Sequence, residues 1–325
     1  MSPALLPPLL ALTVTTLALG IFERLSLGPL DHPNHRSLHH RPTPRIGGLG
    51  MATGVVVALG YVRLGDWHNV LVVAFALCAL SLADDYLHVP AGLRFLAHAA
   101  AAALFLYASP WAGWPWAALL AVGIGLVWFT NLYNFMDGAD GLAGGMALFG
   151  FGAYALAALW QGQPVLFLIC VVLVASALGF LFFNFPPAQL FLGDAGSIPL
   201  GFLAGALGFA GWQDGVWPAW FPLLVFSPFV VDASVTLLRR VLHGEKPWQA
   251  HRSHYYQRLV RLGTSHKRLA LMEYALMLAL AGSALAVLRF APYLASALLV
   301  AWGLFYMWAL RAVDRRWHQT HGDEL

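Results

Sequence analysis

The fold class is decided by residues 142–183, LAGGMALFGFGAYALAALWQGQPVLFLICVVLVASALGFLFF, a stretch that contains no charged residue. Its apolar runs, 142–160 and 164–183, each have the length of about 20 residues that a helix needs to cross a bilayer. The only polar break between them is the short turn WQGQP. Two such runs in succession predict two membrane-spanning helices joined by a tight turn.

Apolar runs of this kind recur along the whole chain. We expect eleven spans, at 3–23, 46–62, 69–84, 93–109, 114–131, 142–160, 164–183, 197–212, 216–238, 270–288 and 291–311. The composition agrees, because 60% of the 325 residues are hydrophobic and 10% are charged, whereas about a quarter are charged in soluble domains. The sequence therefore predicts one all-α membrane domain over residues 1–325, a polytopic transmembrane bundle of ten or eleven helices. A soluble protein with one anchor is excluded.

The cations lie on one set of connections. Short aromatic connections alternate with longer polar ones, and the short set contains only Arg63 and Arg289 of the 18 lysines and arginines. The positive-inside rule then places the polar connections in the cytoplasm, the N-terminus outside and the C-terminus inside. This arrangement requires an odd number of spans, which eleven satisfies. The first apolar run follows no cation, so we expect a retained span rather than a cleaved signal peptide.

Carboxylates gather on the same polar connections. Asp84 and Asp85 end the third expected span, and Asp137, Asp140 and Asp194 lie on later polar connections. No carboxylate is expected near a bilayer midplane, where ionisable residues usually mark transport pathways. This pattern argues against an ion-coupled transporter and places the polar chemistry at one membrane surface.

The motif NLYNFMDGADGLAGG, residues 131–145, carries the strongest chemical signal. Asn131, Asn134, Asp137 and Asp140 recur at every third position, and residues three apart share one face of a helix. Mg²⁺ is commonly held by one or two carboxylates together with substrate phosphate oxygens. The motif therefore predicts a metal and phosphate site, against the alternative of a polar helix end followed by an ordinary turn.

Three further clusters lie on the polar connections. LGDAGS contains Asp194, and Ser197 with Pro199 predicts a helix start whose free N–H groups attract anions. The element HRSH, with His251, Arg252 and His254, lies in the longest cytoplasmic loop, 239–269. A segment rich in His and Arg, residues 31–48, includes Arg45. Helix capping and contact between basic loops and anionic lipids are the alternatives, but together the clusters supply what holds a metal and a diphosphate.

The order of these motifs resembles the MraY/WecA superfamily of polyprenyl-phosphate N-acetylhexosamine-1-phosphate transferases. The opening DHPNHRSLHHRPTPRIGG is similar to the WecA-like branch, which serves O-antigen and related surface glycans. The resemblance implies a multi-pass enzyme of the bacterial inner membrane with its active site on the cytoplasmic face. It would transfer a sugar 1-phosphate from a UDP-N-acetylhexosamine to undecaprenyl phosphate, with Mg²⁺ or alternatively Mn²⁺, and release UMP. A homodimer is a further expectation, and no nucleic acid is expected as a partner.

The resemblance also implies roles for individual residues. Asp137 and Asp194 would hold the metal, while Asp84 and Asp85 would act on the lipid phosphate or the metal. The remaining expected substrate-binding residues are Arg45, Asn131, Asn134, Asp140, His251, Arg252 and His254. HRSH replaces the triple histidine of MraY, which argues against a muramyl-pentapeptide substrate. The alternatives are an MraY-type transferase, a transporter of lipid-linked glycans and a structural membrane scaffold.

Overall fold

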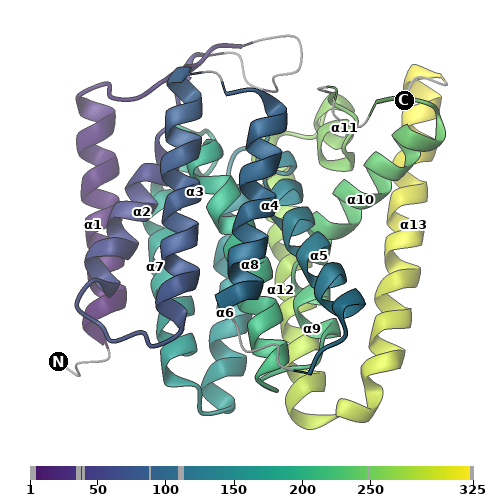
Figure 1. The fold of residues 1–325 in the computed structure, drawn as a ribbon. Helices are drawn as coiled ribbons and strands as arrows, with labels where there is room; N and C mark the ends of the chain where they lie inside the picture. The colour runs from purple at the N-terminus through teal and green to yellow at the C-terminus, as the bar shows by residue number, and fades with distance from the viewer. Residues whose placement is uncertain are drawn as a thin grey trace.

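The computed structural model describes residues 5–33, 38, 41–87, 89–108, 113–246, 249 and 251–322. Part of the His- and Arg-rich segment, positions 34–37, 39 and 40, lies outside these residues, and so does His88. The described chain is almost entirely helical (Figure 1). Its elements are α1 (Leu6–Arg24), β1 (Leu30–Asp31), β2 (Thr43–Pro44), α2 (Gly47–Leu59), α3 (Trp67–Leu87), α4 (Ala91–Ala108), α5 (Trp116–Phe135), α6 (Leu142–Trp160), α7 (Pro164–Asn184), α8 (Asp194–Gln213), α9 (Trp220–Val225), α10 (Ser227–Leu242), α11 (Tyr255–Arg261), α12 (His266–Phe290), the 3₁₀ turn Pro292–Leu294 and α13 (Ala295–His321).

The prediction of a polytopic helical membrane protein is confirmed. Nine helices of the described chain are long and apolar enough to cross a membrane. Two of the eleven expected spans differ from that pattern. The 13 residues of α2 reach only about 20 Å at 1.5 Å per residue. The expected span 216–238 is divided into α9 and α10 at Phe226, just before Pro228, whose ring cannot continue a preceding helix. The number of spans therefore stays a prediction.

The core of the bundle is built from α6, α7 and α8. The apolar window of α8 is 83% buried, whereas none of the corresponding window of α13 is buried. Small residues allow the backbones to approach closely, which is how helices associate in lipid. Gly48 of α2 faces the start of α8, where an added Cβ would lie 2.2 Å from the Gly196 nitrogen. This contact fixes α2 directly against the first turn of α8.

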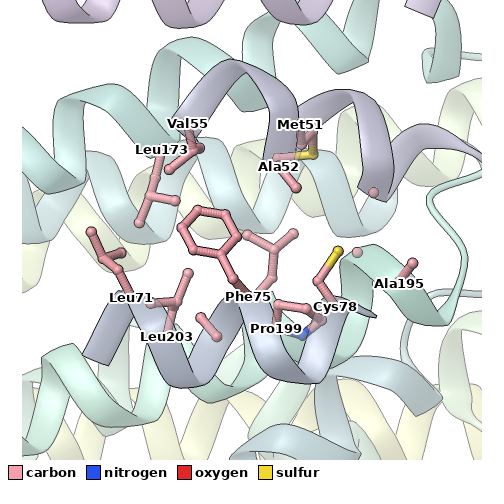
Figure 2. Close-up of a pocket in the computed structure, with 14 residues that line it drawn as sticks. Met51, Ala52, Val55, Leu71, Phe75, Cys78, Leu173, Ala195, Pro199 and Leu203 are labelled. Carbon is pink, nitrogen blue, oxygen red and sulfur yellow. The ribbon is translucent and has the colours of Figure 1, made fainter. Parts of the chain in front are cut away.

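A small apolar cavity lies between α2, α3 and α8 (Figure 2). Its volume is about 40 Å³, and Met51, Phe75, Cys78 and Leu203 are among the side chains around it. Ala195, which follows Asp194, closes one end. Because the lining offers no charged group, the cavity is a packing feature beside the site and supplies no reacting side chain.

The polar connections meet at one end of the bundle (Figure 1). The C-terminal ends of α1, α3 and α5, the start of α4 and the short helix α11 all lie there. Helix α1 begins at the opposite end, whereas α13 ends at the polar end. That arrangement is the one expected for an odd number of crossings, while the side of the membrane to which the polar end belongs stays a prediction.

Candidate active site

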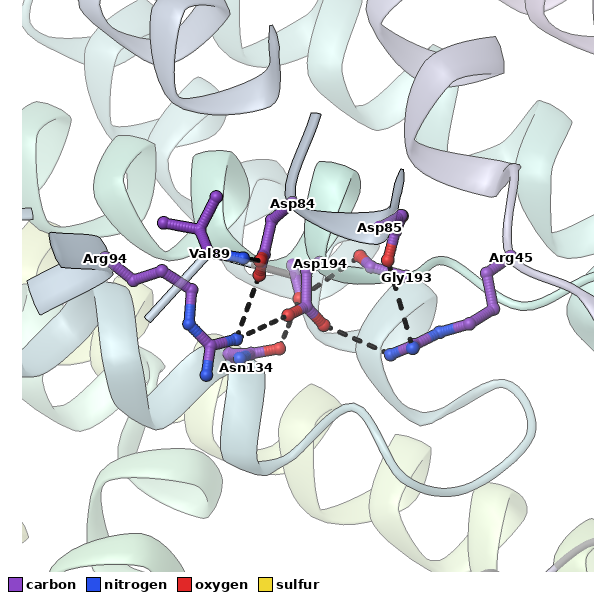
Figure 3. A network of polar contacts seen from close by, with 9 residues as sticks. Arg45, Asp84, Asp85, Val89, Arg94, Asn134, Gly193 and Asp194 are labelled. Carbon is purple, nitrogen blue, oxygen red and sulfur yellow. Dashed lines mark hydrogen bonds and ion pairs between the residues drawn. The ribbon is translucent and has the colours of Figure 1, made fainter. Parts of the chain in front are cut away.

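Three carboxylates and two guanidinium groups form one network at the polar end of the bundle (Figure 3). Asp84 and Asp85 come from the last turn of α3, and Asp194 is the first residue of α8. Arg45 Nη2 lies 3.2 Å from Asp194 Oδ1, and its Nη1 lies 4.0 Å from Asp85 Oδ1. Arg94 Nη1 lies 3.0 Å from Asp84 Oδ2 and 3.7 Å from Asp194 Oδ2. The structure thus brings together residues from four separate segments.

Backbone pairing explains why Arg45 reaches Asp194. The segment before α2 runs beside the segment before α8, where the Gly47 and Gly48 N–H groups donate to the carbonyls of Phe191 and Leu192 at 2.9 and 2.8 Å. Gly193 then has a φ of +71°, which favours glycine. The turn places Asp194 at a helix N-terminus, where the helix dipole stabilises a negative charge.

Helix α8 starts earlier than the sequence suggested. The prediction of a start at Ser197 and Pro199 is wrong, because the helix begins at Asp194 and Pro199 lies inside it. Pro199 lies beyond the first turn and removes one backbone hydrogen bond, a loss that helices in membranes tolerate when neighbouring groups compensate for it. The Ser197 hydroxyl instead donates to Asn134 Oδ1 at 2.8 Å. This bond ties α5 to the first turn of α8, which begins with Asp194.

The expected polar row of residues 131–140 does not stay on one helical face. Helix α5 ends at Phe135, so only Asn131 and Asn134 lie on it, while Asp137 and Asp140 follow in the loop. The Asn131 amide donates to the Val127 carbonyl at 2.7 Å. The row is therefore split between a helix end and the loop beyond it, because the helix cannot continue through the glycine-containing turn.

Asp137 is the member of this row that faces the carboxylate network. It is half-buried and accepts a hydrogen bond from the Gly193 backbone. Burial raises the pKa of Asp137 to about 7; the nearby Asp194 carboxylate adds to the rise, and Arg45 and the Gly193 N–H oppose it. Asp137 therefore lies close enough to Asp194 for the two charges to interact.

Asp140 lies on the other side of the loop. Its Oδ2 accepts from the Ala188 N–H at 3.1 Å, and its Oδ1 lies 3.3 Å from Nδ1 of His266, the first residue of α12. The adjoining Gly141 N–H donates to Asn184 Oδ1 at 2.9 Å. In the structure Asp140 thus anchors the loop to α12 and to the segment after α7, and its expected contact with substrate stays a prediction.

The HRSH element lies next to the C-terminal end of α5. His251 and His254 lie with ring centroids 4.8 Å apart, and His254 stacks on Phe135 at the end of α5. Tyr256 donates its hydroxyl to the Phe135 carbonyl at 3.1 Å, which fixes the element beside the Asp137 loop. Burial, with the nearby His254 and Arg240, lowers the pKa of His251 to about 3. Arg252, between the two histidines, is exposed.

Two residues of the site were not among the candidates from sequence. Arg94, in the first turn of α4, binds both Asp84 and Asp194. The only signal for it in the sequence is a cation at the start of the span that follows the Asp84–Asp85 pair. Asp232 of α10 lies 3.1 Å from His254 Nδ1 and is separated from it by 22 residues. No local pattern in the sequence links Asp232 to His254, so only the folded chain could reveal their contact.

The carboxylates suit an open Mg²⁺ site rather than a closed protein cage. Within the described ranges no three His, Cys, Asp or Glu side chains converge on a single point. Asp85 Oδ2 is buried and has no hydrogen-bond partner among the described residues. Mg²⁺ needs only one or two carboxylates and completes its shell with phosphate oxygens and water. An unpartnered carboxylate oxygen beside Asp194 fits that requirement.

Comparison with known proteins places the chain in a family. A model of glycosyl transferase family 4 matches residues 67–211. The probable undecaprenyl-phosphate N-acetylglucosaminyl 1-phosphate transferase of Bacillus subtilis is 30% identical over 272 residues, which cover 77% of this chain and 75% of the relative. The chain belongs to glycosyl transferase family 4.

Other relatives of this family 4 glycosyl transferase agree. The decaprenyl-phosphate N-acetylglucosaminephosphotransferase of Mycobacterium tuberculosis H37Rv is 28% identical over 318 residues, covering 82% of this chain and 78% of the relative. The phospho-N-acetylmuramoyl-pentapeptide-transferase of Lacticaseibacillus paracasei is 44% identical over only 86 residues, or 26% of this chain and 27% of the relative. The resemblance to the MraY/WecA superfamily is confirmed, the WecA-like branch fits, and the interpretation as an enzyme is favoured over a transporter or a scaffold.

Proposed function

We propose that this enzyme transfers an N-acetylhexosamine 1-phosphate from a UDP-sugar to undecaprenyl phosphate and releases UMP. The observation that carries the proposal is the network of Asp84, Asp85 and Asp194 with Arg45 and Arg94 at one end of a membrane bundle. The names of the long-matching relatives support both the lipid phosphate and the sugar phosphate. N-acetylglucosamine, which those names specify, is the first sugar to test.

Asp194 and Asp137 would hold a Mg²⁺ ion. Once bound, the ion would neutralise negative charge on the diphosphate of the UDP-sugar. The donor set fits, because Asp137 accepts a hydrogen bond from the Gly193 backbone, next to Asp194, and lies near enough to feel the charge of Asp194. Asp85, with one oxygen buried and unpartnered among the described residues, is the adjoining carboxylate. These three side chains form the part of the site that would contact the nucleotide diphosphate.

The two arginines would bind the phosphate groups. Each guanidinium has five N–H donors in a planar fork that matches phosphate oxygens. Arg94 contacts both Asp84 and Asp194 through Nη1 alone, and its side chain is 39% exposed. Its other donors can therefore hold the polyprenyl phosphate while Asp84 fixes the guanidinium in place. Arg45, on the opposite side of Asp194, would bind the diphosphate of the UDP-sugar in the same way.

The transfer itself needs little proton movement. An oxygen of the polyprenyl phosphate would attack the sugar-bearing β-phosphorus, and the bond from this phosphorus to the UMP oxygen would break. The attacking phosphate monoester is already close to a dianion near pH 7. Positioning and charge stabilisation therefore supply most of the rate, as in other phosphoryl transfers. His251 and His254 would hold the nucleotide-sugar from the α11 side.

The proposed location is the bacterial inner membrane, with the site on the cytoplasmic face. The distribution of cations supports it, because the short connections at the other end contain only Arg63 and Arg289. A UDP-sugar is water-soluble, whereas a polyprenyl phosphate stays in the bilayer. A site at a membrane surface is the place where the two can meet.

The test is release of UMP by the purified protein with undecaprenyl phosphate, Mg²⁺ and a panel of UDP-N-acetylhexosamines. Asp194→Asn should lower turnover by about 100-fold or more, the loss typical when a group that stabilises transition-state charge is removed. Asp214→Asn is the matched control, because Asp214 follows the other end of the same helix α8. Failure to release UMP with any sugar, or near-normal turnover by Asp194→Asn, would contradict the proposal.

A further inference from the structure

Helix α10 carries polar residues on its buried side. Asp232, Thr236 and Arg240 are spaced four apart and are 7%, 3% and 4% exposed, whereas Leu238 and Leu242 of the same helix are 59% and 74% exposed. Burying charged groups is costly unless they find partners. Asp232 and Thr236 contact each other, and Arg240 binds Glu245 and the Gln249 carbonyl at 2.6 and 3.1 Å. The stripe therefore organises the loop that contains HRSH.

Asp232 is the centre of this arrangement. Its carboxylate accepts four hydrogen bonds, from the backbone N–H groups of Tyr255 and Tyr256, each at 3.0 Å, and from Thr236 Oγ1 and His254 Nδ1, each at 3.1 Å. The two backbone bonds satisfy free N–H groups at the start of α11. The backbone N–H of the N-cap residue, His254, is satisfied separately by Gln257 Oε1 at 3.2 Å, so this capping bond does not require the contact between the His254 ring and Asp232.

The bond to Asp232 determines which nitrogen of His254 carries a proton. A carboxylate accepts hydrogen bonds but cannot donate them, so Nδ1 of His254 must be protonated. In the neutral ring Nε2 is then the acceptor nitrogen. The ring is stacked between Phe135 and Tyr256, with centroids 6.3 and 5.8 Å away, which resists rotation. Position and tautomer are both fixed.

His251 has the opposite arrangement. Its Nδ1 lies 3.4 Å from the Ser253 nitrogen and 2.9 Å from the Ser253 hydroxyl. A backbone N–H can only donate, so Nδ1 of His251 is the acceptor and the proton of the neutral ring is on Nε2. The neighbouring rings therefore present different groups, an N–H donor on His251 and an acceptor nitrogen on His254.

We propose that Asp232 is a positioning residue that holds His254 with Nε2 as a hydrogen-bond acceptor beside the Nε2–H donor of His251. The pair would thus bind a phosphate or carbonyl oxygen of the nucleotide-sugar through His251 and a hydroxyl or N–H of the same ligand through His254. This assignment of ligand chemistry rests on the proposed function. The tautomers themselves follow from the four contacts of Asp232 and the two of Ser253.

The first experiment measures the tautomers without turnover. Protein labelled with ¹⁵N-histidine in detergent micelles gives long-range ¹H–¹⁵N correlations that distinguish the two neutral forms, and His254→Gln identifies the signals of His254. At pH 8 the unmodified protein should show His254 protonated on Nδ1 only. Protonation on Nε2, or on both nitrogens, would overturn the proposal whether or not the protein transfers any sugar.

The second experiment separates positioning from helix capping. Asp232→Ala removes the carboxylate that accepts from His254 Nδ1, so the ring should no longer keep its proton on Nδ1 alone. We expect kcat to fall about 10- to 100-fold, the range for a residue that orients a functional histidine. Thr236→Val is the matched control. It removes the hydroxyl group that donates to Asp232 and should change neither kcat nor the tautomer of His254. An unchanged tautomer and kcat in Asp232→Ala, or an equal loss in Thr236→Val, would refute the positioning role.

Discussion

Metal binding by this enzyme should depend on the proton of Asp137. Burial raises the pKa of this carboxyl to about 7 in the metal-free protein, so the group is largely protonated below that pH and ionised above it. A metal can bind only the ionised form and must displace the proton. Because a group of pKa about 7 is half protonated at neutral pH, the apparent dissociation constant should rise about tenfold between pH 8 and pH 6.

The assay is titration of the protein with Mn²⁺, followed by the EPR signal of the free ion, at intervals between pH 6 and pH 8 and without substrates. Asp137→Asn should bind Mn²⁺ more weakly at every pH and lose most of the pH dependence. Asp214→Asn, at the opposite end of α8, should keep the tenfold change. A dissociation constant in the unmodified protein that changes by less than about twofold over this range would refute the linkage between the proton and the metal.

Two further predictions concern packing and the C-terminal helix. Gly48→Ala would place a Cβ 2.2 Å from the Gly196 nitrogen, so it should destabilise the protein by about 1–3 kcal/mol and lower its thermal denaturation temperature. Gly303→Ala is the control, because an added Cβ there would have no atom from elsewhere in the described chain within 4 Å; it should be neutral or slightly stabilising. Asp314 of α13 contacts Arg239, Arg258 and Tyr255 at 2.7, 3.2 and 3.4 Å, and so holds α11 in place. Asp314→Ala should raise the KM for the UDP-sugar several-fold, whereas Arg316→Gln, at an exposed position, should not; equal KM values for the two variants would show that α13 does not position the loop.

Most of the helices could be predicted from sequence because a bilayer imposes a simple rule. Apolar runs of about 20 residues are rarely anything other than spans in so uncharged a chain. The rule fails where a helix is short or broken, as at α2 and at the boundary between α9 and α10. Length and hydropathy do not report a change of direction at Phe226 and Pro228, because the stretch 216–231 around them contains no charged residue.

The site was predicted in part for a related reason. Asp84, Asp85, Asp137 and Asp194 stand out because carboxylates are rare in this composition, and the structure brings Asp84, Asp85 and Asp194 into one network while Asp137 adjoins it. The spacing of residues 131–140 was misleading, because periodicity assumes that α5 continues past Phe135. Asp140 accordingly contacts His266, which lies 126 residues further along the chain.

The sequence by itself determined the class of protein, the concentration of charge at one end of the bundle and the identity of the acidic motifs. These properties are local, since each depends on the composition of one segment and on the solvent that surrounds it. Only the tertiary structure decided which partner each polar side chain has. Arg94 joins Asp84 to Asp194, and Asp232 holds His254, because helices distant in sequence pack side by side and a buried charge must find its partner among whatever residues they bring near.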